Sequence, residues 1–335
     1  MNLVTGATGI LGIRLMTDLL LNGEKVRGLK RPTSDTSLVK KIIEFTTGKK
    51  DLYDNIEWFE GDVLDIISLS EAMSGCNHVY HCAAVVSYHA RDRDQMYEVN
   101  VEGTANVVNV ALDKGIAKLC FVSSIAAIGK TTNNAWLDEK NEWVESSFNT
   151  HYGITKHLSE MEVWRGIQEG LQAIVINPGI IIGPGEFNRS SASIFKKLDE
   201  GLNYYPPGGT GLVSVEDCSR FAIALTKKDI SAERYVFVAE NLSMKEVFDM
   251  VSSSLGKKLP AKLATPAILR LARFGEWLKE IFTGRKALVT RESTRNSSVR
   301  FYYKNEKVIK ETGFTFMPVG DAISATAKCF RHINN

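Results

Sequence analysis

The chain has no excess of charge of either sign, because 41 Lys and Arg residues are matched by 39 Asp and Glu among 335 residues. Such a balance gives no sign of the basic patch that binds nucleic acid or an anionic membrane. Cysteine is scarce, with five residues and no Cys-x-x-Cys pair, so we expect neither a disulfide framework nor a metal site. These absences favour a cytoplasmic protein with reduced thiols and a small-molecule partner.

Long hydrophobic runs are also missing. The longest apolar stretches, such as AIVINPGIII at 173–182, are interrupted by Asn, Pro and Gly. They fall short of the roughly 20 apolar residues of a spanning helix. The first residues show no charged leader followed by a short apolar core, so we expect neither a signal peptide nor a membrane segment. With 44% hydrophobic residues, the chain can still build a sizeable core.

The first half of the chain alternates β-branched runs with amphipathic helical segments. Strands that alternate with helices predict an α/β fold, a Rossmann-type doubly wound parallel sheet covered by helices on both faces. After about residue 177, Gly- and Pro-rich loops separate isolated helices, which indicates a smaller, irregular α+β lobe. We therefore expect a Rossmann domain over 1–177, with a fold-back segment near 211–240, and a substrate-binding lobe over 178–335.

Three glycines spaced three apart, Gly6, Gly9 and Gly12, lie between the first predicted strand and the first predicted helix. A glycine-rich turn at this junction lets the backbone approach a pyrophosphate, which also meets the free N–H groups of the helix. The spacing differs from the general G-x-G-x-x-G fingerprint, so the strand–turn–helix context carries the prediction. We expect this turn to bind a dinucleotide.

The end of the second predicted strand bears on which dinucleotide binds. The segment KVRGLKR (25–31) ends in Lys30 and Arg31, and no carboxylate follows before Asp35. A basic side chain here accepts the 2′-phosphate of NADP, whereas an acidic one holds the 2′-hydroxyl of NAD. We therefore expect NADP(H), with NAD(H) as the alternative if these cations are merely solvated. Asp62, after the third predicted strand, is positioned to accept a hydrogen bond from the adenine amino group.

Tyr152 and Lys156 lie one helical turn apart and so on one face of a predicted helix. A free phenol has a pKa of about 10, and a nearby ammonium lowers it toward the range useful for proton transfer. Tyr303 and Lys307 have the same spacing, so spacing alone is weak evidence. Tyr303 has no strand-end serine upstream, and we interpret it as a packing residue.

Two serines stand at the carboxyl end of the predicted strand before Tyr152, where ligands of open parallel sheets collect. We expect the Ser124 hydroxyl to hydrogen-bond a substrate carbonyl and to stabilise its developing negative charge. Ser123 should lie nearer the cofactor. Together, Ser124, Tyr152 and Lys156 predict hydride transfer at carbon with proton transfer at oxygen through the tyrosine.

Six motifs together resemble the extended short-chain dehydrogenase/reductases: TGATGILG (5–12), GDV (61–63), HCAA (81–84), FVSSIAAIG (121–129), YGITK (152–156) and NPGIIIGPG (177–185). Within that superfamily of NAD-dependent epimerases, dehydratases and reductases, the chain looks most like the dihydroflavonol-4-reductase and 3β-hydroxysteroid dehydrogenase branch. The resemblance spans nearly the whole chain. It implies a Rossmann fold with a C-terminal substrate lobe and NAD(P)-dependent oxidoreductase activity.

The resemblance also implies roles for individual residues. It implies a catalytic set of Ser124, Tyr152 and Lys156, supported by Asn100, and it matches Arg31 to the position that binds the 2′-phosphate. The implied cofactor contacts outside this set are Gly6, Thr8, Gly9, Ile10, Leu11, Asp62, Val63, Ala83, Ala84 and Pro178.

Substrate-facing residues should come from the loop Val85–Tyr97 and from the lobe, where we expect Phe187, Phe195, Tyr204 and Tyr205 to contribute. These side chains are mostly apolar or aromatic. They suit a medium-sized hydrophobic ketone or aldehyde better than a sugar nucleotide, whose diphosphate needs Arg or Lys.

The sequence thus predicts an NADPH-dependent enzyme that interconverts a carbonyl and an alcohol. Two alternatives stay open. The first is a nucleotide-sugar epimerase or dehydratase with tightly bound NAD, whose substrate diphosphate could be bound by Arg189, Lys196 and Lys197. The second is a non-catalytic NADP(H)-sensing regulator, which would use the same fold. Helix-mediated homodimers are common in the family, but no residue here identifies an interface.

Overall fold

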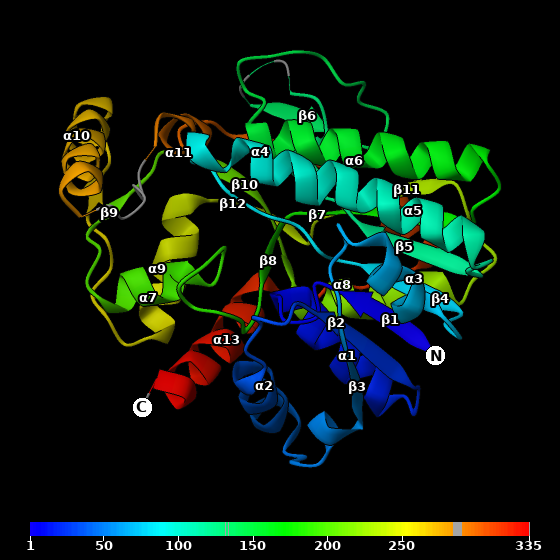
Figure 1. Ribbon diagram of the computed structural model, residues 1–335. Helices are drawn as coiled ribbons and strands as arrows, with labels where there is room; N and C mark the ends of the chain where they lie inside the picture. Colours follow the sequence, from blue (N-terminus) through cyan, green and yellow to red (C-terminus); the bar gives the residue numbers. More distant parts are fainter. Residues whose placement is uncertain (131, 133, 284–289, 335) are drawn as a thin grey trace.

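The computed structural model describes residues 1–130, 132, 134–283 and 290–334, and its centre is a seven-stranded parallel sheet (Figure 1). The strand order is β11-β7-β5-β4-β1-β2-β3. The strands are β1 (Asn2–Thr5), β2 (Val26–Lys30), β3 (Ile56–Glu60), β4 (His78–His81), β5 (Lys118–Val122), β7 (Ala173–Pro178) and β11 (Glu233–Phe237). The order reverses between β1 and β4, and this switch point is where open parallel sheets bind their ligands.

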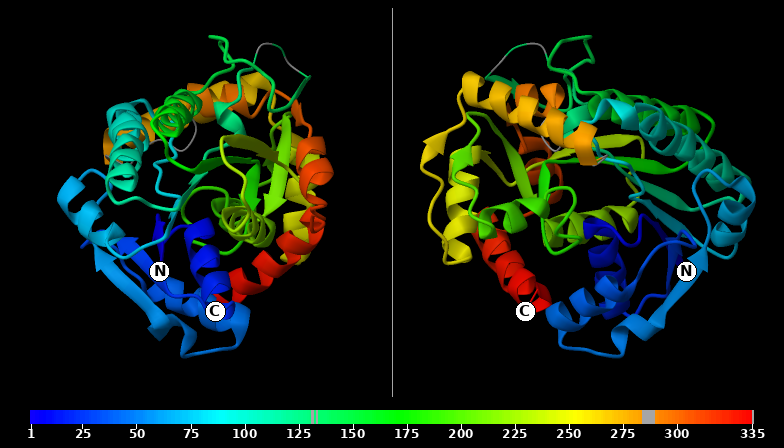
Figure 2. Two further views of the ribbon diagram at one scale, coloured as in Figure 1. Left: turned by 90° about the vertical axis from the view of Figure 1, so that its right-hand side faces the viewer. Right: turned by 60° about the vertical axis from the view of Figure 1, so that its left-hand side comes forward.

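Helices cover both faces of this sheet, as Figure 2 shows. One face is packed by α1 (Ile10–Leu21), α2 (Ser37–Thr47) and α8 (Val215–Thr226), and the other by α3 (Ile66–Met73), α5 (Gly103–Asp113) and α6 (His151–Gln168). Because both faces are buried, the strands β5 and β7 read as nearly continuous apolar runs rather than alternating ones. The predicted α/β class and Rossmann-type sheet are confirmed.

The rest of the chain forms smaller sheets and helices, in agreement with the expected α+β lobe. The small sheets are β8 (Ile180–Ile182) with β10 (Gly209–Ser214) and β12 (Glu240–Ser243), β9 (Tyr204–Tyr205) with β13 (Lys262–Leu263), and β6 (Ala135–Leu137) with β14 (Phe301–Tyr303). The remaining helices are α4 (Arg93–Tyr97), α7 (Ser193–Asp199), α9 (Met244–Ser254), α10 (Pro266–Thr283), α11 (Arg291–Asn296), α12 (Glu306–Thr312) and α13 (Val319–Asn334). None of the helices searched in the described part of the chain is long and apolar enough to cross a membrane.

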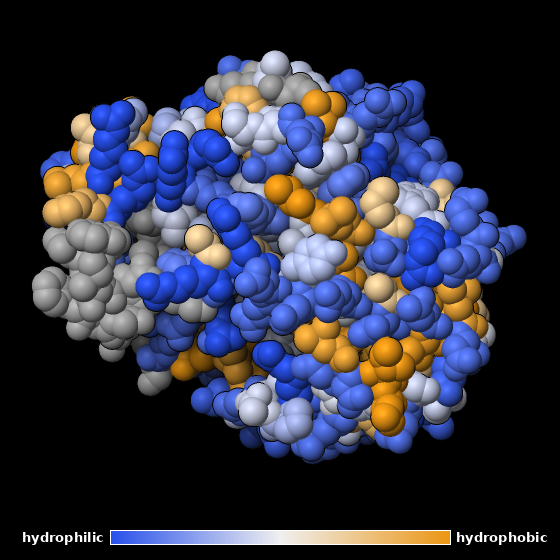
Figure 3. Space-filling model, turned by 45° about the horizontal axis from the view of Figure 1, so that its top comes forward, coloured by the Kyte–Doolittle hydropathy of each residue, from blue (hydrophilic) through white to orange (hydrophobic). Residues whose placement is uncertain are grey.

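Two features tie the lobe to the large sheet. The chain returns after residue 178 to add β11 to the sheet edge beside β7, and α8 packs along α1. The termini of the chain lie on the same side of the molecule in both views of Figure 2. On the face seen in Figure 3, hydrophobic side chains form several separate patches among hydrophilic ones.

Candidate active site

The glycine turn between β1 and α1 depends on close backbone approaches. Gly6 has a φ of +65°, and a Cβ built on it would lie 2.7 Å from the backbone nitrogen of Ala83. A Cβ on Gly12 would lie 2.2 Å from the carbonyl oxygen of Gly6. No side chain fits at either position, so these glycines hold the turn tightly against the end of β4.

The start of α1 is open to a ligand. Its N-cap is the exposed Gly9, which supplies no capping side chain, and no acidic residue lies in the first turn. The first N–H groups of the helix therefore keep their hydrogen-bonding capacity, next to the positive end of the helix dipole. These features fit the pyrophosphate of a dinucleotide. Of the other turn residues predicted to contact it, Thr8 is half-buried and Leu11 is buried.

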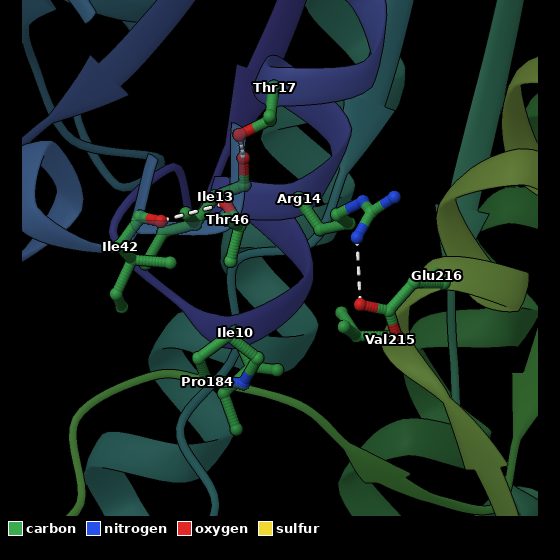
Figure 4. Close-up of a pocket in the computed structure, with 9 residues that line it drawn as sticks. All are labelled: Ile10, Ile13, Arg14, Thr17, Ile42, Thr46, Pro184, Val215 and Glu216. Atoms are coloured by element: carbon green, nitrogen blue, oxygen red, sulfur yellow. Dashed lines mark hydrogen bonds and ion pairs between the residues drawn. The ribbon is translucent and has the colours of Figure 1, made fainter. Parts of the chain in front are cut away.

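Ile10 packs against the loop after β8 and so connects that loop with the glycine turn. A Cβ on Gly185 would lie 2.4 Å from the Ile10 side chain, and Figure 4 shows Ile10 beside Pro184. A cavity of about 450 Å³ opens nearby, lined by Arg14, Phe45, Thr46, Pro184, Glu216, Asp321, Ser324, Ala325 and Lys328. Neither Ser124 nor Tyr152 lines it, so it is separate from the catalytic residues that the sequence predicts.

Lys30 and Arg31, the two cations predicted to bind a 2′-phosphate, have different surroundings at the end of β2. The Lys30 ammonium lies 2.6 Å from a carboxylate oxygen of Glu60, its neighbour in the β2–β3 register. The charge of Lys30 thus already has a partner across the sheet, and its contact with a 2′-phosphate stays a prediction. Arg31 follows β2, is exposed, and its side chain makes no hydrogen bond or ion pair within the described residues. Arg31 is the cation that is left for a phosphate.

The predicted adenine contact lies at the carboxyl end of β3. Asp62 is half-buried, and its Oδ1 accepts the backbone N–H of Leu64 at 3.0 Å. Val63 is buried, and its carbonyl accepts a hydrogen bond from Asn106 Nδ2 at 3.0 Å. These bonds fix the segment after β3, and the contact with adenine stays a prediction.

A buried histidine organises the carboxyl end of β4. His81 Nδ1 lies 2.7 Å from the Thr5 hydroxyl, and Nε2 lies 3.0 Å from the Thr104 hydroxyl. The Thr5 oxygen accepts the N–H groups of Cys82 and Ala83, so its own proton is free for Nδ1. The neutral ring with its proton on Nε2 therefore satisfies the whole network. This network places Ala83, which is half-buried, and Ala84, which is exposed, where cofactor contacts are expected.

The stability of the protein should fall in acid because of His81. Burial, and next the charge of Lys156, lower the pKa of His81 from 6.5 to about 3. Below pH 6.5 the His81 side chain binds a proton in the unfolded chain but not in the folded chain. The stability that the neutral histidine contributes is therefore fully present above that pH. It should then decrease by at most about 1.4 kcal/mol per pH unit as the pH falls toward about 3.

Urea denaturation of the native chain and of His81→Gln between pH 7 and pH 4 measures this effect. The glutamine variant should be less stable at pH 7 and should show a shallower decline. Parallel curves for the two proteins would contradict the assignment of the acid sensitivity to His81.

Tyr152 lies in the first turn of α6, which is fixed from two sides. The N-cap Thr150 accepts the N–H of Gly153 at 3.0 Å, within the same helix end. Glu292 of α11 accepts the N–H of His151 at 2.7 Å. A carboxylate at this position also complements the positive end of the helix dipole. The C-terminal part of the chain therefore helps to hold the helix that carries Tyr152.

The structure brings Ser124 and Tyr152 together. Ser124 follows β5, its oxygen accepts the N–H of Ala126 at 3.1 Å, and its hydroxyl lies close enough to the Tyr152 phenol to lower the pKa of that phenol. Burial raises the pKa of Tyr152 by more than Ser124 lowers it. The phenol is therefore protonated at neutral pH, which suits a proton donor.

Lys156 lies one turn further along α6 and is 1% exposed. Its ammonium donates to the carbonyl of Val122 at 2.9 Å and lies 4.2 Å from the centroid of the Phe121 ring. Burial lowers the pKa of Lys156 to about 8. The ammonium points to the backbone of β5 and is not among the groups that shift the pKa of Tyr152. The expected lowering of the Tyr152 pKa by Lys156 is therefore not found.

Asn100 acts on the loop after β4. Its amide forms two hydrogen bonds with the backbone of Val85, accepting from N–H at 2.7 Å and donating to the carbonyl at 3.0 Å. It also donates to the Thr155 hydroxyl at 3.0 Å, next to Lys156 on α6. The π-helical segment Glu98–Glu102 carries it. These contacts make Asn100 a positioning residue, which corrects its place among the catalytic residues.

The other strand-end serine, Ser123, hydrogen-bonds to a buried carboxylate. Ser123 donates to Oε1 of Glu160 at 2.5 Å, and Asn177 Nδ2 lies 2.5 Å from the same oxygen. Arg234 lies 3.2 Å from the other carboxylate oxygen. Because its hydroxyl is taken up by this buried carboxylate, Ser123 does not turn toward the cofactor side as expected. Pro178, the remaining predicted cofactor contact, is buried at the end of β7.

The residues of the lobe that were predicted to contact substrate lie in two different places in the structure. Phe187 is 6% exposed, with its ring centroid 4.9 Å from that of Phe330, so it packs in the core of the lobe and is corrected to a structural residue. Phe195 belongs to the same core. Tyr204 and Tyr205 form the short strand β9, and no hydrogen bond or ring contact joins them to Tyr152 within the described residues.

Tyr303, the second tyrosine with a lysine four residues later, is 2% exposed and packs in a cluster with Ile125 and Ile128. Its packing role is confirmed for the ring. Lys307 pairs instead with Glu233 at 2.5 Å.

Sequence reasoning missed Tyr88 and Asn296. Tyr88 lies in the loop after β4, and its hydroxyl is 3.5 Å from Asn296 Nδ2 on α11. Ionisation of Tyr88 would raise the pKa of Tyr152. The sequence predicts that this loop faces the substrate but singles out only its first residue, Val85. No local signal connects positions 208 residues apart.

Comparisons with known proteins agree with this fold. The model of the NAD dependent epimerase/dehydratase family matches residues 2–232. A putative dihydroflavonol 4-reductase of Synechocystis is 28% identical over 98% of this chain and 94% of its own length. Cinnamoyl-CoA reductase 1 of Petunia hybrida is 30% identical over 74% of this chain and 75% of its own.

Solved structures share the fold along the whole chain. The crystal structure of gox2253 is 30% identical, covers 99% of this chain and 98% of its own, and superposes with a TM-score of 0.80. The UDP-glucose 4-epimerase of Thermus thermophilus, solved with NAD, is 20% identical, covers 98% of each chain and superposes with a TM-score of 0.74. The chain therefore belongs to the NAD dependent epimerase/dehydratase family, within the extended short-chain dehydrogenase/reductases, and is an NAD(P)-dependent oxidoreductase.

Proposed function

We propose that the protein is an NADPH-dependent carbonyl reductase that acts on a medium-sized, mostly apolar ketone or aldehyde. The observation that carries this proposal is that the structure brings Ser124 and a protonated Tyr152 together at the carboxyl end of β5. Two neighbouring hydroxyl groups can both donate a hydrogen bond to one incoming carbonyl oxygen. The relatives named as reductases support the reduction of a carbonyl rather than another reaction of the family.

NADP(H), when bound, supplies the hydride that adds to the carbonyl carbon. The residues that would hold it are the glycine turn at Gly6–Gly12 for the pyrophosphate, Asp62 for the adenine, and Arg31 for the 2′-phosphate. Ala83 and Ala84 would contact it at the end of β4. Their fit rests on the open start of α1 and on the free guanidinium of Arg31.

The side chains then have separate tasks. Ser124 donates a hydrogen bond to the carbonyl oxygen as negative charge develops there. Tyr152 gives its phenolic proton to the same oxygen and becomes a phenolate. The Lys156 ammonium, buried one turn away and held by the Val122 carbonyl, would have to turn toward the phenolate to stabilise that negative charge. Water must afterwards return a proton to Tyr152.

NADPH oxidation at 340 nm, followed across ketones, aldehydes and UDP- or GDP-sugars, tests the proposal. Turnover of apolar carbonyl compounds, and none of the sugar nucleotides, is the expected result. Consumption of no carbonyl compound in the panel would overturn it.

A nucleotide-sugar epimerase or dehydratase is the second candidate, since the solved structures of similar fold include UDP-glucose 4-epimerases. Such an enzyme would purify with NAD bound and would need cations for the diphosphate. Of the cations that the sequence offers for that task, Arg189 pairs with Glu186 at 3.3 Å and Lys196 donates to Asn188 at 2.6 Å. Lys197 makes no side-chain hydrogen bond or ion pair within the described residues, so one of the three cations is left for the diphosphate, which favours the carbonyl reductase. The NADP(H)-sensing regulator is disfavoured because the catalytic side chains are present together.

The preference for NADPH should depend on Arg31. A hydrogen bond to a charged group contributes about 1.5–3 kcal/mol, so Arg31→Ala should weaken NADPH binding by roughly 10- to 150-fold and leave NADH binding nearly unchanged. Fluorescence titration of both cofactors into both proteins measures this. Lys30→Ala serves as the matched control, because Lys30 is paired with Glu60 and should matter less. Equal affinities of the native chain for the two cofactors would contradict the assignment.

A cytoplasmic location and a homodimer also belong to this proposal. The location is supported by the five cysteines, all of which carry free thiols. Dimerisation is testable by sedimentation, with a single 37.2 kDa species as the contradicting result.

A further inference from the structure

A buried asparagine of β7 holds the backbone of Ser124. Asn177 is 0% exposed and lies on the strand that pairs with β5. Its Nδ2 donates to the Ser124 carbonyl at 2.9 Å and lies 2.5 Å from Oε1 of Glu160 on α6. Both N–H groups of the amide are therefore used, one by the serine backbone and the other by a carboxylate.

Ser124 itself is held at its carbonyl and at its hydroxyl. The carbonyl also accepts the N–H of Ala127 at 3.0 Å, and the hydroxyl oxygen accepts the N–H of Ala126 at 3.1 Å. Because a carbonyl oxygen has two lone pairs, Asn177 and Ala127 together complete its bonding. Without Asn177, the carbonyl would keep one of these two bonds, from a helix of three residues, Ile125–Ala127.

The orientation of the Asn177 amide leaves its oxygen unpaired. This Oδ1 is buried and has no hydrogen-bond partner within the described residues. Buried polar atoms without a partner are unfavourable, and native proteins contain few of them. A turn of the amide by 180° would not help, because Oδ1 would then face two acceptors, the Ser124 carbonyl and the Glu160 carboxylate. The amide is therefore kept in the orientation that holds Ser124.

Glu160 belongs to a row of α6 side chains that face the same strand end. Lys156, four residues earlier, donates to the Val122 carbonyl at 2.9 Å, and Glu160 accepts the hydroxyl of Ser123 at 2.5 Å. These two strand residues are thus held directly by α6, and the next one is held through the Asn177 amide. Side chains four apart lie on one face of a helix, so this spacing lets α6 hold three consecutive residues.

The charge of Glu160 is balanced by β11. Arg234 lies 3.2 Å from Oε2 of the carboxylate, and its guanidinium also donates to the Glu139 carbonyl. The Glu139 side chain in turn accepts the N–H of Val236 at 2.8 Å. A buried carboxylate that is paired with a cation can stay ionised, and an ionised acceptor makes the stronger hydrogen bonds. The strand that the chain adds on its return from the lobe therefore supports the hold of Glu160 on Asn177.

We propose that Glu160 and Asn177 are positioning residues, which fix the backbone of Ser124 so that its hydroxyl meets the substrate carbonyl oxygen beside Tyr152. Both side chains are fully buried, so they act through Ser124 and not on the substrate. The segment that carries Tyr152 and Lys156 thus contains a third functional position, four residues after the lysine. This inference rests on the proposed carbonyl reductase activity, because it adds supporting residues to the same site.

Steady-state kinetics with NADPH and 1-phenylpropan-2-one test this role in Asn177→Ala and Glu160→Ala. A misplacement of about 1 Å can cost 10²-fold in rate, so kcat should fall by roughly 10- to 100-fold. KM and the affinity for NADPH should stay within about threefold, because the loss lies in the transition state rather than in binding. A general loss of folded structure would instead weaken NADPH binding as well.

Asn2→Ala is the matched control. Asn2 is 4% exposed, and its Nδ2 also donates to a carboxylate, that of Glu24 at 2.9 Å, and to a backbone carbonyl, that of Lys25 at 3.2 Å. It lies at the amino end of β1, whereas parallel sheets bind ligands at the carboxyl ends, so its loss should change kcat by less than about twofold. An Asn177→Ala enzyme with a kcat as close to the native value as that of Asn2→Ala would overturn the inference.

Two further variants distinguish positioning from a merely structural role. Glu160→Gln keeps an oxygen that accepts the bonds of Ser123 and Asn177, so it should regain most of the kcat that Glu160→Ala loses. In a Ser124→Ala background, Asn177→Ala should lower kcat by less than about twofold, because residues that act through one group are not additive. Losses that multiply fully in both backgrounds would show that Asn177 does not act through Ser124.

Hydrogen exchange separates this inference from the proposed function. The N–H groups of Ala126 and Ala127 bond to Ser124, so deuterium uptake in the peptide 121–129 reports its hold without any turnover. Uptake there should be about threefold to tenfold faster in Asn177→Ala, the range for one lost hydrogen bond, and unchanged in Asn2→Ala. Faster uptake supports the positioning role even if no ketone is reduced, and then the proposed activity alone fails. Native uptake in Asn177→Ala overturns the role even if ketones are reduced.

Discussion

Tyr152→Phe should reduce kcat for carbonyl reduction by about 10²- to 10⁴-fold, the usual contribution of a positioned proton donor. The substitution removes one oxygen atom and keeps the ring. The phenol is the group that can supply a proton where the carbonyl oxygen would lie, since it is protonated beside Ser124 and Lys156 is directed to the Val122 carbonyl. The loss should therefore appear in kcat rather than in cofactor binding.

Single-turnover NADPH oxidation, combined with fluorescence titration of NADPH, distinguishes these effects. The expected result is an unchanged affinity for NADPH with a much slower chemical step. Tyr97→Phe is the control, because the same oxygen is removed from an exposed tyrosine on α4. A Tyr152→Phe enzyme that keeps more than half of its native kcat would rule out the proposed proton transfer.

The parts of the site that the sequence predicted are those set by local spacing and by the rule for parallel sheets. Gly6 and Gly12 could be recognised because a strand–turn–helix junction has room for little else, and the structure gives approaches of 2.7 Å and 2.2 Å for a Cβ there. Ser124 and Tyr152 could be associated because the carboxyl ends of parallel strands meet at one edge. Such signals lie within about thirty residues of one another.

What could not be predicted depends on register and on distant pairs. Nothing in the segment around Lys30 reveals that the β2–β3 register sets it opposite Glu60, so Lys30 and Arg31 looked equivalent. Phe187 looked like a substrate residue, although the rings of the lobe bury it against Phe330. Asn296 is tied to Tyr88 only through the tertiary fold. Periodicity predicts which elements form, but partners from separate elements are chosen by packing.

The orientation of Lys156 gives a related lesson about charge. The Tyr-x-x-x-Lys spacing correctly predicted that both side chains lie along one helix, α6. It did not predict that the ammonium would be bound by the Val122 carbonyl and covered by the Phe121 ring. Burial then dominates the pKa of both groups, raising that of the phenol and lowering that of the ammonium to about 8.

Arg234→Leu should strongly lower the free energy of unfolding, although the arginine side chain is 18% exposed. The Glu160 carboxylate is fully buried one turn beyond Lys156, and Arg234 is its cationic partner at 3.2 Å. Removing one partner of a buried ion pair costs about 3–5 kcal/mol, because the other charge stays buried without compensation. The hydrogen bonds from Ser123 and Asn177 remain, so we expect about 3 kcal/mol, the lower end of that range.

The double variant Arg234→Leu/Glu160→Gln provides the decisive control for this charge argument. A neutral amide oxygen can still accept the hydrogen bonds of Ser123 and Asn177, and it needs no cation. The double variant should therefore unfold at a higher urea concentration than Arg234→Leu alone, whereas two additive losses would show that packing, not charge, is responsible.

The pH dependence of the Arg234→Leu deficit gives an independent check. Burial already raises the pKa of Glu160 above its ordinary value of 4.5, and loss of the arginine raises it further. A carboxyl whose folded pKa is raised destabilises the fold when it is ionised in the unfolded chain, that is, above 4.5. The difference in unfolding free energy between the native chain and Arg234→Leu should therefore shrink as the pH falls toward 4.5. A difference that is constant between pH 8 and pH 4.5 would mean that the guanidinium acts through its contact with the Glu139 backbone instead.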